Sequence, residues 1–353
     1  MTTPATQQAT ARTHGEPIVR VRDLSRHFVV GRRGHARQTL RAVDRIGFDA
    51  FAGETLGLVG ESGSGKSTIG RMLVGLLPAT EGRIDLFGET ITGHDGARAL
   101  ARIRHRIQFV FQDPHAAMNP RMRIADLVAE PIDVKGGYSR RDRTDRIAEL
   151  LELVGLSADF ANRYPHEFSG GQRQRIVIAR ALALDPAFVV CDEPVASLDV
   201  SMQAQVINLL LDLQDRLGLS YLFIAHDLAV VRAVAHRVAV LYAGQIVELA
   251  DKRALYGEPL HPYTKALLAA IPRPNGGVRP PPIRGEVPSL LNRPPGCPLA
   301  PRCPQVFDRC RTELPALREV APGRHVACHL HDGDWRPIER FPTIAGVPAA
   351  PVA

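Results

Sequence analysis

Lysine is scarce in this chain. Only four of its 44 basic residues are lysines, at positions 66, 135, 252 and 265, so the net charge of +7 comes almost wholly from arginine. No run of five or more basic residues occurs in the sequence. A net positive charge permits nucleic acid or an anionic membrane face as a partner, but here the basic residues do not form a continuous binding tract.

Long hydrophobic runs are also missing. No stretch reaches 18 uninterrupted apolar residues, and the longest candidate, residues 228–244, is broken by Arg232, His236 and Arg237. We therefore expect no transmembrane helix. Residues 1–17 lack the apolar segment of a secretory signal, and we interpret them as a disordered leader. Any association with a membrane must then come through partner proteins.

The pattern along the chain predicts an α/β fold with a helical insert. Short apolar stretches separated by turn residues predict strands over 18–90, with one helix opening near residue 65. From about 119 to 183 the spacing of apolar residues is helical, and Ser139 and Asp142 form a capping box ahead of an apolar stripe. The stripe consists of Ile147, Leu150, Leu151 and Val154. Strands return between 187 and 248, and such an order is typical of α/β domains.

A glycine-rich loop stands where the first helix opens. Gly60 is followed, after four residues, by Gly65, Lys66 and Ser67, between an apolar strand and a helix. This is the context that a phosphate-binding loop requires, because backbone N–H groups at a helix N-terminus cradle the phosphates. Lys66 places a charge on those oxygens, and the Ser67 hydroxyl ligates Mg²⁺. The predicted nucleotide-binding residues here are Gly60, Ser62, Gly63, Ser64, Gly65, Lys66, Ser67 and Thr68.

An apolar stretch that ends in two acids forms the second element. Residues 187–191 lead into Asp192 and Glu193, ahead of a proline. In phosphate-loop enzymes a strand-end aspartate holds Mg²⁺ directly or through water. A carboxylate that follows it can orient or deprotonate the attacking water. Cys191, at the end of the apolar run, is interpreted as a small buried hydrophobe.

Between these elements lies "YPHEFSGGQRQRIVIARAL", residues 164–182. With the phosphate-binding loop and the acidic strand end, it resembles the ATP-binding subunits of ABC transporters, although Phe168 replaces the usual leucine of the signature sequence. A Ser-Gly-Gly at a helix start offers N–H donors to an anion. The resemblance implies a head-to-tail dimer in which each signature closes over the other subunit's γ-phosphate. The signature residues are Ser169, Gly170, Gly171 and Gln172.

The resemblance assigns four further positions. Gln112 matches the Q-loop, whose amide reaches the Mg²⁺ or the attacking water and couples the nucleotide to transport. His226 matches the switch histidine that bonds the γ-phosphate. Asp199 matches the loop that crosses the dimer, although the order Ala-Ser before it leaves the role of Ser197 open. Phe28 is the candidate for stacking on adenine, with core packing as the alternative.

The tail resembles the C-terminal extension of oligopeptide, dipeptide and nickel importer ATPases, and this resemblance spans about residues 18–330. The tail follows a Pro/Gly-rich break at 272–285 and contains four of the five cysteines, Cys297, Cys303, Cys310 and Cys328. A disulfide framework is disfavoured in the cytosol. The cysteines hold a [4Fe–4S] cluster, as in some relatives, or Zn²⁺, or remain free thiols or opportunistic disulfides. Their spacing is not that of a zinc finger.

The sequence thus predicts an α/β phosphate-loop ABC ATPase core, with a RecA-like sheet, an antiparallel β subdomain, a helical subdomain and a small cysteine-containing extension. The predicted boundaries are leader 1–17, ATPase domain 18–257 with the helical subdomain at about 113–183, extension 258–335 and flexible tail 336–353. We expect an ATP-hydrolysing subunit that energises peptide import. Import of nickel or another small solute is the alternative, followed by a soluble ABC-type ATPase acting on nucleic acid or ribosomes.

The resemblance also implies partners and a location. We expect a second ABC ATPase subunit in a heterodimer, two transmembrane permease subunits and an extracytoplasmic substrate-binding protein, and no nucleic acid. The subunit would be peripheral, at the cytoplasmic face of the cell membrane. The implied cofactors are ATP, Mg²⁺ and, in the tail, a [4Fe–4S] cluster.

Overall fold

The computed structural model describes residues 15–31, 37–271, 283, 285, 286, 288–291 and 293–333. The predicted tail, 336–353, lies outside the described residues, as does the predicted leader except for its last three residues. Of these three, Pro17 already begins the first strand. Within the described ranges, no helix has the length and apolar character needed to cross a bilayer.

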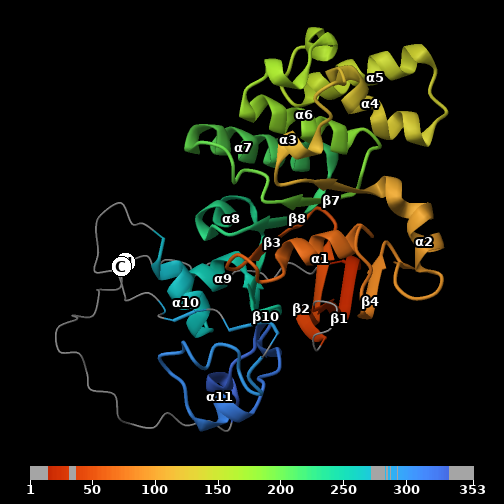
Figure 1. Ribbon diagram of the computed structural model, residues 1–353. Helices are drawn as coiled ribbons and strands as arrows, with labels where there is room; N and C mark the ends of the chain where they lie inside the picture. The colour runs from red at the N-terminus through yellow and green to blue at the C-terminus, as the bar shows by residue number, and fades with distance from the viewer. Residues whose placement is uncertain are drawn as a thin grey trace, which may run out of the picture.

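An eight-stranded sheet forms the centre of the molecule, in the order β11-β12-β10-β9-β3-β8-β7-β6 (Figure 1). The five strands from β9 to β6 pair in parallel, and the three strands at the other edge pair antiparallel. Strands β3, β7 and β8 are buried along their whole length, as expected for parallel strands covered on both faces. The strands are β3 (Thr55–Val59), β6 (Ile107–Val110), β7 (Phe188–Asp192), β8 (Ser220–Ala225), β9 (Arg237–Tyr242), β10 (Gln245–Asp251), β11 (Arg318–Ala321) and β12 (Arg324–Val326).

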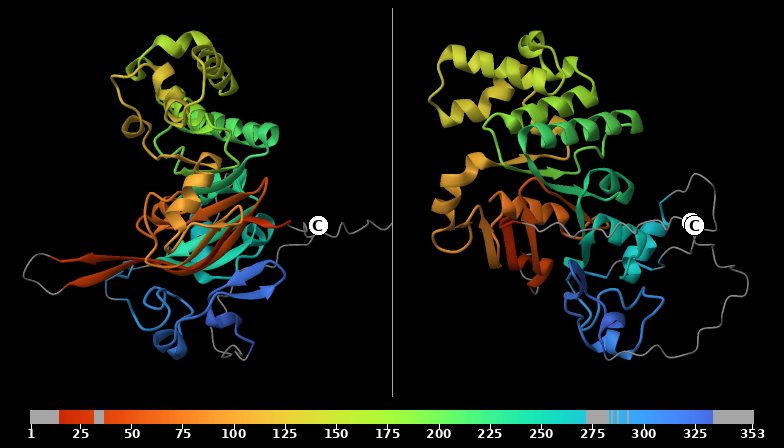
Figure 2. Two further views of the ribbon diagram at one scale, coloured as in Figure 1. Left: turned by 90° about the vertical axis from the view of Figure 1, so that its right-hand side faces the viewer. Right: turned by 180° about the vertical axis from the view of Figure 1, so that it is seen from behind.

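A second, antiparallel sheet has the order β2-β1-β4-β5. Its strands are β1 (Pro17–Val30), β2 (Gln38–Phe51), β4 (Glu81–Leu86) and β5 (Glu89–Thr90). β1 and β2 are 14 residues each, and their paired ends project well beyond the rest of the molecule (Figure 2). The base of this hairpin is fixed because residues such as Val21, Ile46 and Ile84 share one core with α1 and the central sheet.

Further helical elements lie outside the insert and flank the two sheets (Figure 1). They are α1 (Lys66–Leu73), α2 (Gly96–Ile103), the 3₁₀ turn η1 (Arg104–Arg106), α7 (Val200–Leu217), α8 (Leu228–Val234), α9 (Lys252–Gly257) and α10 (Pro262–Ala269). α1 packs on β7 and β8, and Gly70 on this helix lies so close to the sheet that a Cβ there would be 2.9 Å from both Val190 and Ile224.

A helical layer stands above the carboxyl end of β6 (Figure 1). Its elements are α3 (Pro114–Ala117), α4 (Ile124–Lys135), α5 (Arg140–Leu153), η2 (Ala158–Asn162), η3 (Pro165–Glu167) and α6 (Gly170–Leu182). The capping box of Ser139 and Asp142 is confirmed at the start of α5. All four residues of the predicted apolar stripe are buried, none more than 3% exposed.

The extension after α10 is joined to the central sheet. Its elements are α11 (Asp308–Thr312), β11, β12 and η4 (His329–His331). Backbone pairing of Glu248 with Val326 and of Leu249 with His325 makes β12 the neighbour of β10. Neither these two strands nor α2 and β6 were predicted from the sequence. β11 is exposed at every position, and β6 is only four residues long. Neither strand therefore shows a clear hydrophobic period in the sequence.

Candidate active site

The glycine-rich loop connects β3 to α1, as predicted. Gly65 is the N-cap of α1 with φ of +105°, no side chain caps the helix, and its first turn contains no acid. The first N–H groups of α1 are therefore left to an external acceptor, and the helix dipole favours an anion there. The loop is held closely from behind, because a Cβ on Gly65 would lie 2.5 Å from the carbonyl oxygen of Ala42.

Lys66 closes the loop on itself. Its Nζ donates to the carbonyl oxygens of Gly60 at 2.8 Å and Glu61 at 3.0 Å, and the residue is only 4% exposed. Burial lowers the pKa of the Lys66 ammonium, against the opposing pull of nearby carboxylates. An anion that enters the loop would therefore stabilise the charged form of Lys66.

Ser67 and Asp192 meet although they are 125 residues apart. The Ser67 hydroxyl donates to Asp192 Oδ1 at 2.8 Å, and Asp192 is 2% exposed. Burial raises the pKa of the Asp192 carboxyl, the Ser67 hydrogen bond opposing it. Nearby, the Ser64 hydroxyl is buried and has no hydrogen-bond partner among the described residues. The remaining predicted loop residues, Ser62, Gly63 and Thr68, lie on the same loop or on the first turn of α1.

The three predicted catalytic residues converge on one oxygen atom. The Gln112 amide nitrogen donates to Glu193 Oε2 at 2.9 Å, and His226 Nδ1 lies 3.3 Å from the same oxygen. They follow β6, β7 and β8, neighbouring strands whose carboxyl ends meet at one edge of the sheet. Glu193 adopts φ of +47°, which is uncommon outside glycine and is typical of functional sites.

The predicted signature residues begin α6 in the helical layer, apart from α1 on the core sheet (Figure 1). Ser169 and Gln172 form a capping box in which Gln172 N–H donates to Ser169 Oγ at 3.4 Å, and Ser169 N–H donates to the Gln172 side chain at 3.0 Å. Gly171 leaves room for α7, since a Cβ there would lie 3.0 Å from Met202 Sδ. The signature is thus a helix N-terminus packed against α7.

Asp199 has a role that the sequence analysis missed. It is the N-cap of α7, where its carboxylate accepts from Met202 N–H at 2.9 Å. An aspartate directly before an apolar helical run was the available signal. Because Leu198 approaches the position of a Gly170 Cβ at 3.4 Å, this loop and the signature form one surface.

Phe28 lies on β1 opposite Leu40 of β2. The guanidinium of Arg26 stands over its ring, 4.6 Å from the centroid. Two residues further along β2, Ala42 contacts the phosphate-binding loop at Gly65, so Phe28 is only about 7 Å along the strand from that loop. Stacking of adenine on Phe28 stays a prediction.

The four tail cysteines line one small cavity together with His261 and His329. All are free thiols, and burial raises the pKa of Cys297 to about 11 and of Cys328 to about 12. Among the described residues, no three His, Cys, Asp or Glu side chains are grouped so as to hold a metal ion. Cys191, in contrast, is fully buried in the core sheet, which confirms its interpretation as a small hydrophobe.

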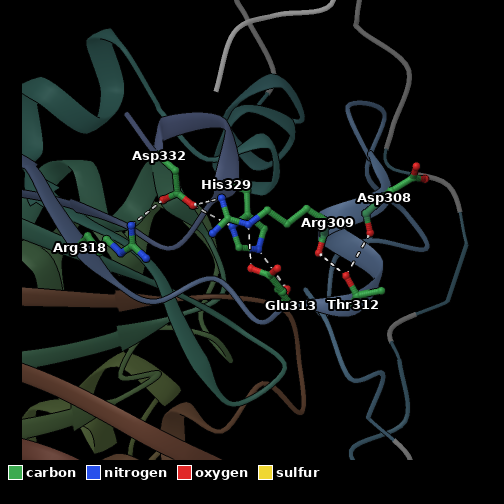
Figure 3. A network of polar contacts seen from close by, with 7 residues as sticks. All are labelled: Asp308, Arg309, Thr312, Glu313, Arg318, His329 and Asp332. Carbon is green, nitrogen blue, oxygen red and sulfur yellow. Dashed lines mark hydrogen bonds and ion pairs between the residues drawn. The ribbon is translucent and has the colours of Figure 1, made fainter. Parts of the chain in front are cut away.

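A polar network holds the segments around this cavity (Figure 3). His329 is 3% exposed, with Nδ1 at 2.9 Å from Asp332 Oδ2 and Nε2 at 3.0 Å from the Glu313 carbonyl oxygen. Asp332 also pairs with Arg309 at 3.0 Å and Arg318 at 3.1 Å. Since Arg309 and His329 each adjoin a cysteine in sequence, the network fixes two of the cysteine-bearing turns.

A loop connects a buried parallel strand to a helix, and a strand beside it ends in Asp-Glu. With the inserted helical layer, these features define a phosphate-loop nucleoside triphosphatase. The comparisons specify the family. Residues 43–196 match the ABC transporter family, and residues 247–310 match the C-terminal region of oligopeptide/dipeptide transporters. The chain belongs to the ATP-binding, ATP-hydrolysing subunits of ABC transporters that have this C-terminal region.

Two relatives and one solved structure show how far the likeness extends. A peptide import ATP-binding protein of Brucella abortus (strain 2308) is 64% identical over 317 residues, covering 90% of this chain and 95% of the relative. One of Brucella ovis is 50% identical over 314 residues, covering 88% of this chain and 97% of the relative. A dimeric ATP-binding cassette in a post-hydrolysis state, bound to ADP and Pi, is 29% identical with a TM-score of 0.59 and covers 67% of this chain and 99% of its own.

Proposed function

We propose that this chain energises the import of peptides, working at the cytoplasmic face of the membrane as the peripheral ATPase of an ABC importer. The observation that carries the enzymatic part is the convergence of Gln112 and His226 on Glu193. The names of the two Brucella relatives and the match to the oligopeptide/dipeptide transporter region support peptides as the cargo.

The loop residues would hold the nucleotide. The uncapped N–H groups of α1 and the Lys66 ammonium are placed for the β- and γ-phosphates. The Ser67 and Asp192 oxygens, 2.8 Å apart, and the Gln112 amide oxygen are donors of the type that Mg²⁺ prefers. Mg²⁺, when bound, offsets the phosphate charge. Phe28 would stack on the adenine from β1.

Glu193 is the group that we assign to the water. Its carboxylate would accept the proton as the water attacks the γ-phosphorus and the bond to the ADP oxygen breaks, giving ADP and phosphate. Gln112, now bonded to the same carboxylate, would hold that water in line, and His226 would bond the γ-phosphate.

The signature surface of Ser169, Gly170, Gly171 and Gln172, with Asp199 beside it, would face the nucleotide of a second subunit. The similar solved cassette is dimeric, which supports this assembly. We infer a heterodimer with a second ABC ATPase subunit, joined to two transmembrane permease subunits and fed by an extracytoplasmic substrate-binding protein. No nucleic acid takes part. Closing and reopening of the dimer would move the permease subunits.

Affinity purification of the tagged chain from mildly solubilised native membranes tests this assembly. We expect two polytopic subunits, a second ATPase and a binding protein by mass spectrometry, and uptake of labelled dipeptides or oligopeptides that stops when Lys66 is replaced by alanine. A binding protein that takes nickel or another small solute would replace peptides as the cargo. Recovery only from the soluble fraction with ribosomal proteins or nucleic acid would contradict the importer.

We further propose that Cys297, Cys303, Cys310 and Cys328 hold a [4Fe–4S] cluster. The four thiols line one cavity, which fits a group bound by four cysteines. The four thiolates would hold the cluster through its irons. Anaerobically purified protein should contain iron and acid-labile sulfide. If zinc is found without iron or sulfide, the four cysteines form a zinc site instead of a cluster site. If iron, sulfide and zinc are all absent, the cysteines are free thiols.

A further inference from the structure

Glu61, the residue after Gly60 in the phosphate-binding loop, is hydrogen-bonded to the C-terminal extension. Its backbone N–H donates to the Tyr263 hydroxyl at 3.0 Å, and its carboxylate is 3.2 Å from Arg302 Nη1. Its carbonyl oxygen accepts from Lys66 Nζ at 3.0 Å. Every polar group of Glu61 is thus engaged, two of them by residues beyond position 257. The start of the loop is therefore set from outside the ATPase domain.

Arg302 is built into the extension before it reaches the loop. Its side chain is only 8% exposed, and its Nη1 also donates to the Tyr242 hydroxyl at 3.2 Å. Its own backbone follows the turn that begins at Cys297, where Ala300 N–H donates to the Cys297 carbonyl at 3.0 Å and Arg302 N–H to the Leu299 carbonyl at 2.8 Å. Since Cys303 comes next, the position of Arg302 depends on the fold of the cysteine-bearing turn.

A second arginine of the same tail supports the other end of the loop. Gly244 N–H donates to the Ser64 carbonyl at 2.9 Å, and Arg293 Nη2 donates to the Ala243 carbonyl at 2.6 Å. Arg293 Nη1 also pairs with the buried carboxylate of Asp44 at 2.7 Å. The turn that backs Ser64 is thus held by the extension, as the start of the loop is.

We propose that Arg302 is a positioning residue for ATP, because through Glu61 it sets the start of the phosphate-binding loop. Nucleotide affinity then depends on the state of the four-cysteine unit, which is the set of turns that carry Cys297, Cys303, Cys310 and Cys328. The inference rests on the proposed nucleotide-binding role of the loop. Arg302 hydrogen-bonds Glu61 and Tyr242, so it would act on the nucleotide through Glu61. Because coupling between two sites is reciprocal, bound nucleotide must also stabilise the cysteine-bearing turn.

The first test measures binding of a fluorescent ATP analogue to the full-length chain, with KM and kcat for ATP in the assembled transporter. We expect Arg302→Ala and Glu61→Gln each to raise Kd and KM about tenfold and to leave kcat within about twofold, because a partly buried charge-assisted pair is lost. Arg302→Lys should recover part of the affinity, since it keeps the charge but not the forked geometry. The double variant should bind no more weakly than either single variant.

Arg324→Ala is the matched control. Arg324 is an arginine of the same extension whose ion pair, with Glu258, lies outside the network around Asp332. Its Kd should match the wild type within about twofold. If Arg302→Ala does not fold, Glu61→Gln and Arg302→Lys decide the question alone. A wild-type chain that fails to bind the analogue would refute the proposed function, whereas equal binding by wild type and the Glu61→Gln variant would refute only the role of Arg302.

A second readout does not depend on activity. The rate at which iodoacetamide alkylates the four tail cysteines, followed by peptide mass spectrometry, should fall in wild type when ATP is added. In Glu61→Gln this protection should be lost at ATP concentrations that saturate both proteins. Equal protection in the two proteins would contradict a route through Glu61 and Arg302.

Discussion

Gln112 and Glu193, 81 residues apart in sequence, are joined by a 2.9 Å hydrogen bond from the amide nitrogen to the carboxylate. Gln112 also stands between the core sheet and the helical layer, since β6 ends just before it and α3 begins just after it. A nucleotide that draws Gln112 toward its metal or water must break this bond. In the proposed mechanism, the link between Glu193 and the helical layer would therefore change when ATP binds.

Replacing Glu193 with glutamine should keep the hydrogen bond to Gln112 but remove the base. We expect ATP turnover to fall about a hundredfold or more, because general bases contribute about 10²–10⁴-fold. The variant should retain ATP and accumulate as a closed dimer, measured by phosphate release and by nucleotide retained after gel filtration. Glu152→Gln, at an exposed position on α5, is the control. Full turnover by Glu193→Gln would refute the assignment.

Gly65→Ala should abolish nucleotide binding. The new Cβ would lie 2.5 Å from the Ala42 carbonyl at φ of +105°, so both the contact and the backbone conformation oppose it. We expect a stability loss of about 2 kcal/mol or more. Gly63→Ala is the matched control for stability, because φ is +78° there but nothing lies within 4 Å of the new Cβ. ATP titration measures the loss of binding in Gly65→Ala, and thermal unfolding that ranks the two variants equally would contradict the steric explanation.

Ser67→Ala should raise the Mg²⁺ concentration needed for half-maximal ATPase activity by about tenfold, because one oxygen donor is lost and 1.4 kcal/mol corresponds to a factor of about ten. It also leaves the buried Asp192 carboxylate without its hydroxyl donor, which should cost about 1–3 kcal/mol of unfolding free energy in the nucleotide-free chain. Mg²⁺ titrations and urea unfolding measure the two effects. The control is Ser157→Ala, at the N-cap of η2. An unchanged Mg²⁺ requirement would exclude Ser67 as a ligand.

Low pH should destabilise the helical layer because Asp133 becomes protonated. Arg143 holds the pKa of this carboxyl below its ordinary value by a hydrogen bond of 2.8 Å, burial opposing the shift. A carboxyl with a depressed pKa stabilises the fold above its ordinary pKa of about 4, and this contribution is lost as pH falls below that value. Because Asp133 is about half exposed, we expect a contribution below about 1 kcal/mol.

Asp133→Asn should remove this pH dependence and match the wild type only in acid. Urea unfolding at pH 7 and pH 3 measures the difference between the two proteins at each pH. Asp145→Asn, in a longer and more exposed pair with Arg141, serves as the control. A constant difference between wild type and Asp133→Asn at both pH values would show that the ion pair does not titrate as described.

The local parts of the site could be predicted from the sequence. The loop between Gly60 and Ser67 has a strand before it and a helix after it, and the α5 capping box is contained within four residues. Long-range pairs could not be predicted in this way. The convergence of Gln112, Glu193 and His226 follows from strand order, which no local period encodes. The Arg302–Glu61 pair spans 241 residues and leaves no pattern at either end.

The pairing of β12 with β10 has a consequence for the core sheet. Without residues 258–353, β10 would become a terminal strand with unpaired N–H and C=O groups beside side chains such as Val247 and Leu249, which are no more than 5% exposed in the full chain. Such a bare, apolar edge is a template for pairing with other chains. The extension thus protects the ATPase domain from aggregation, whatever else its cysteines do.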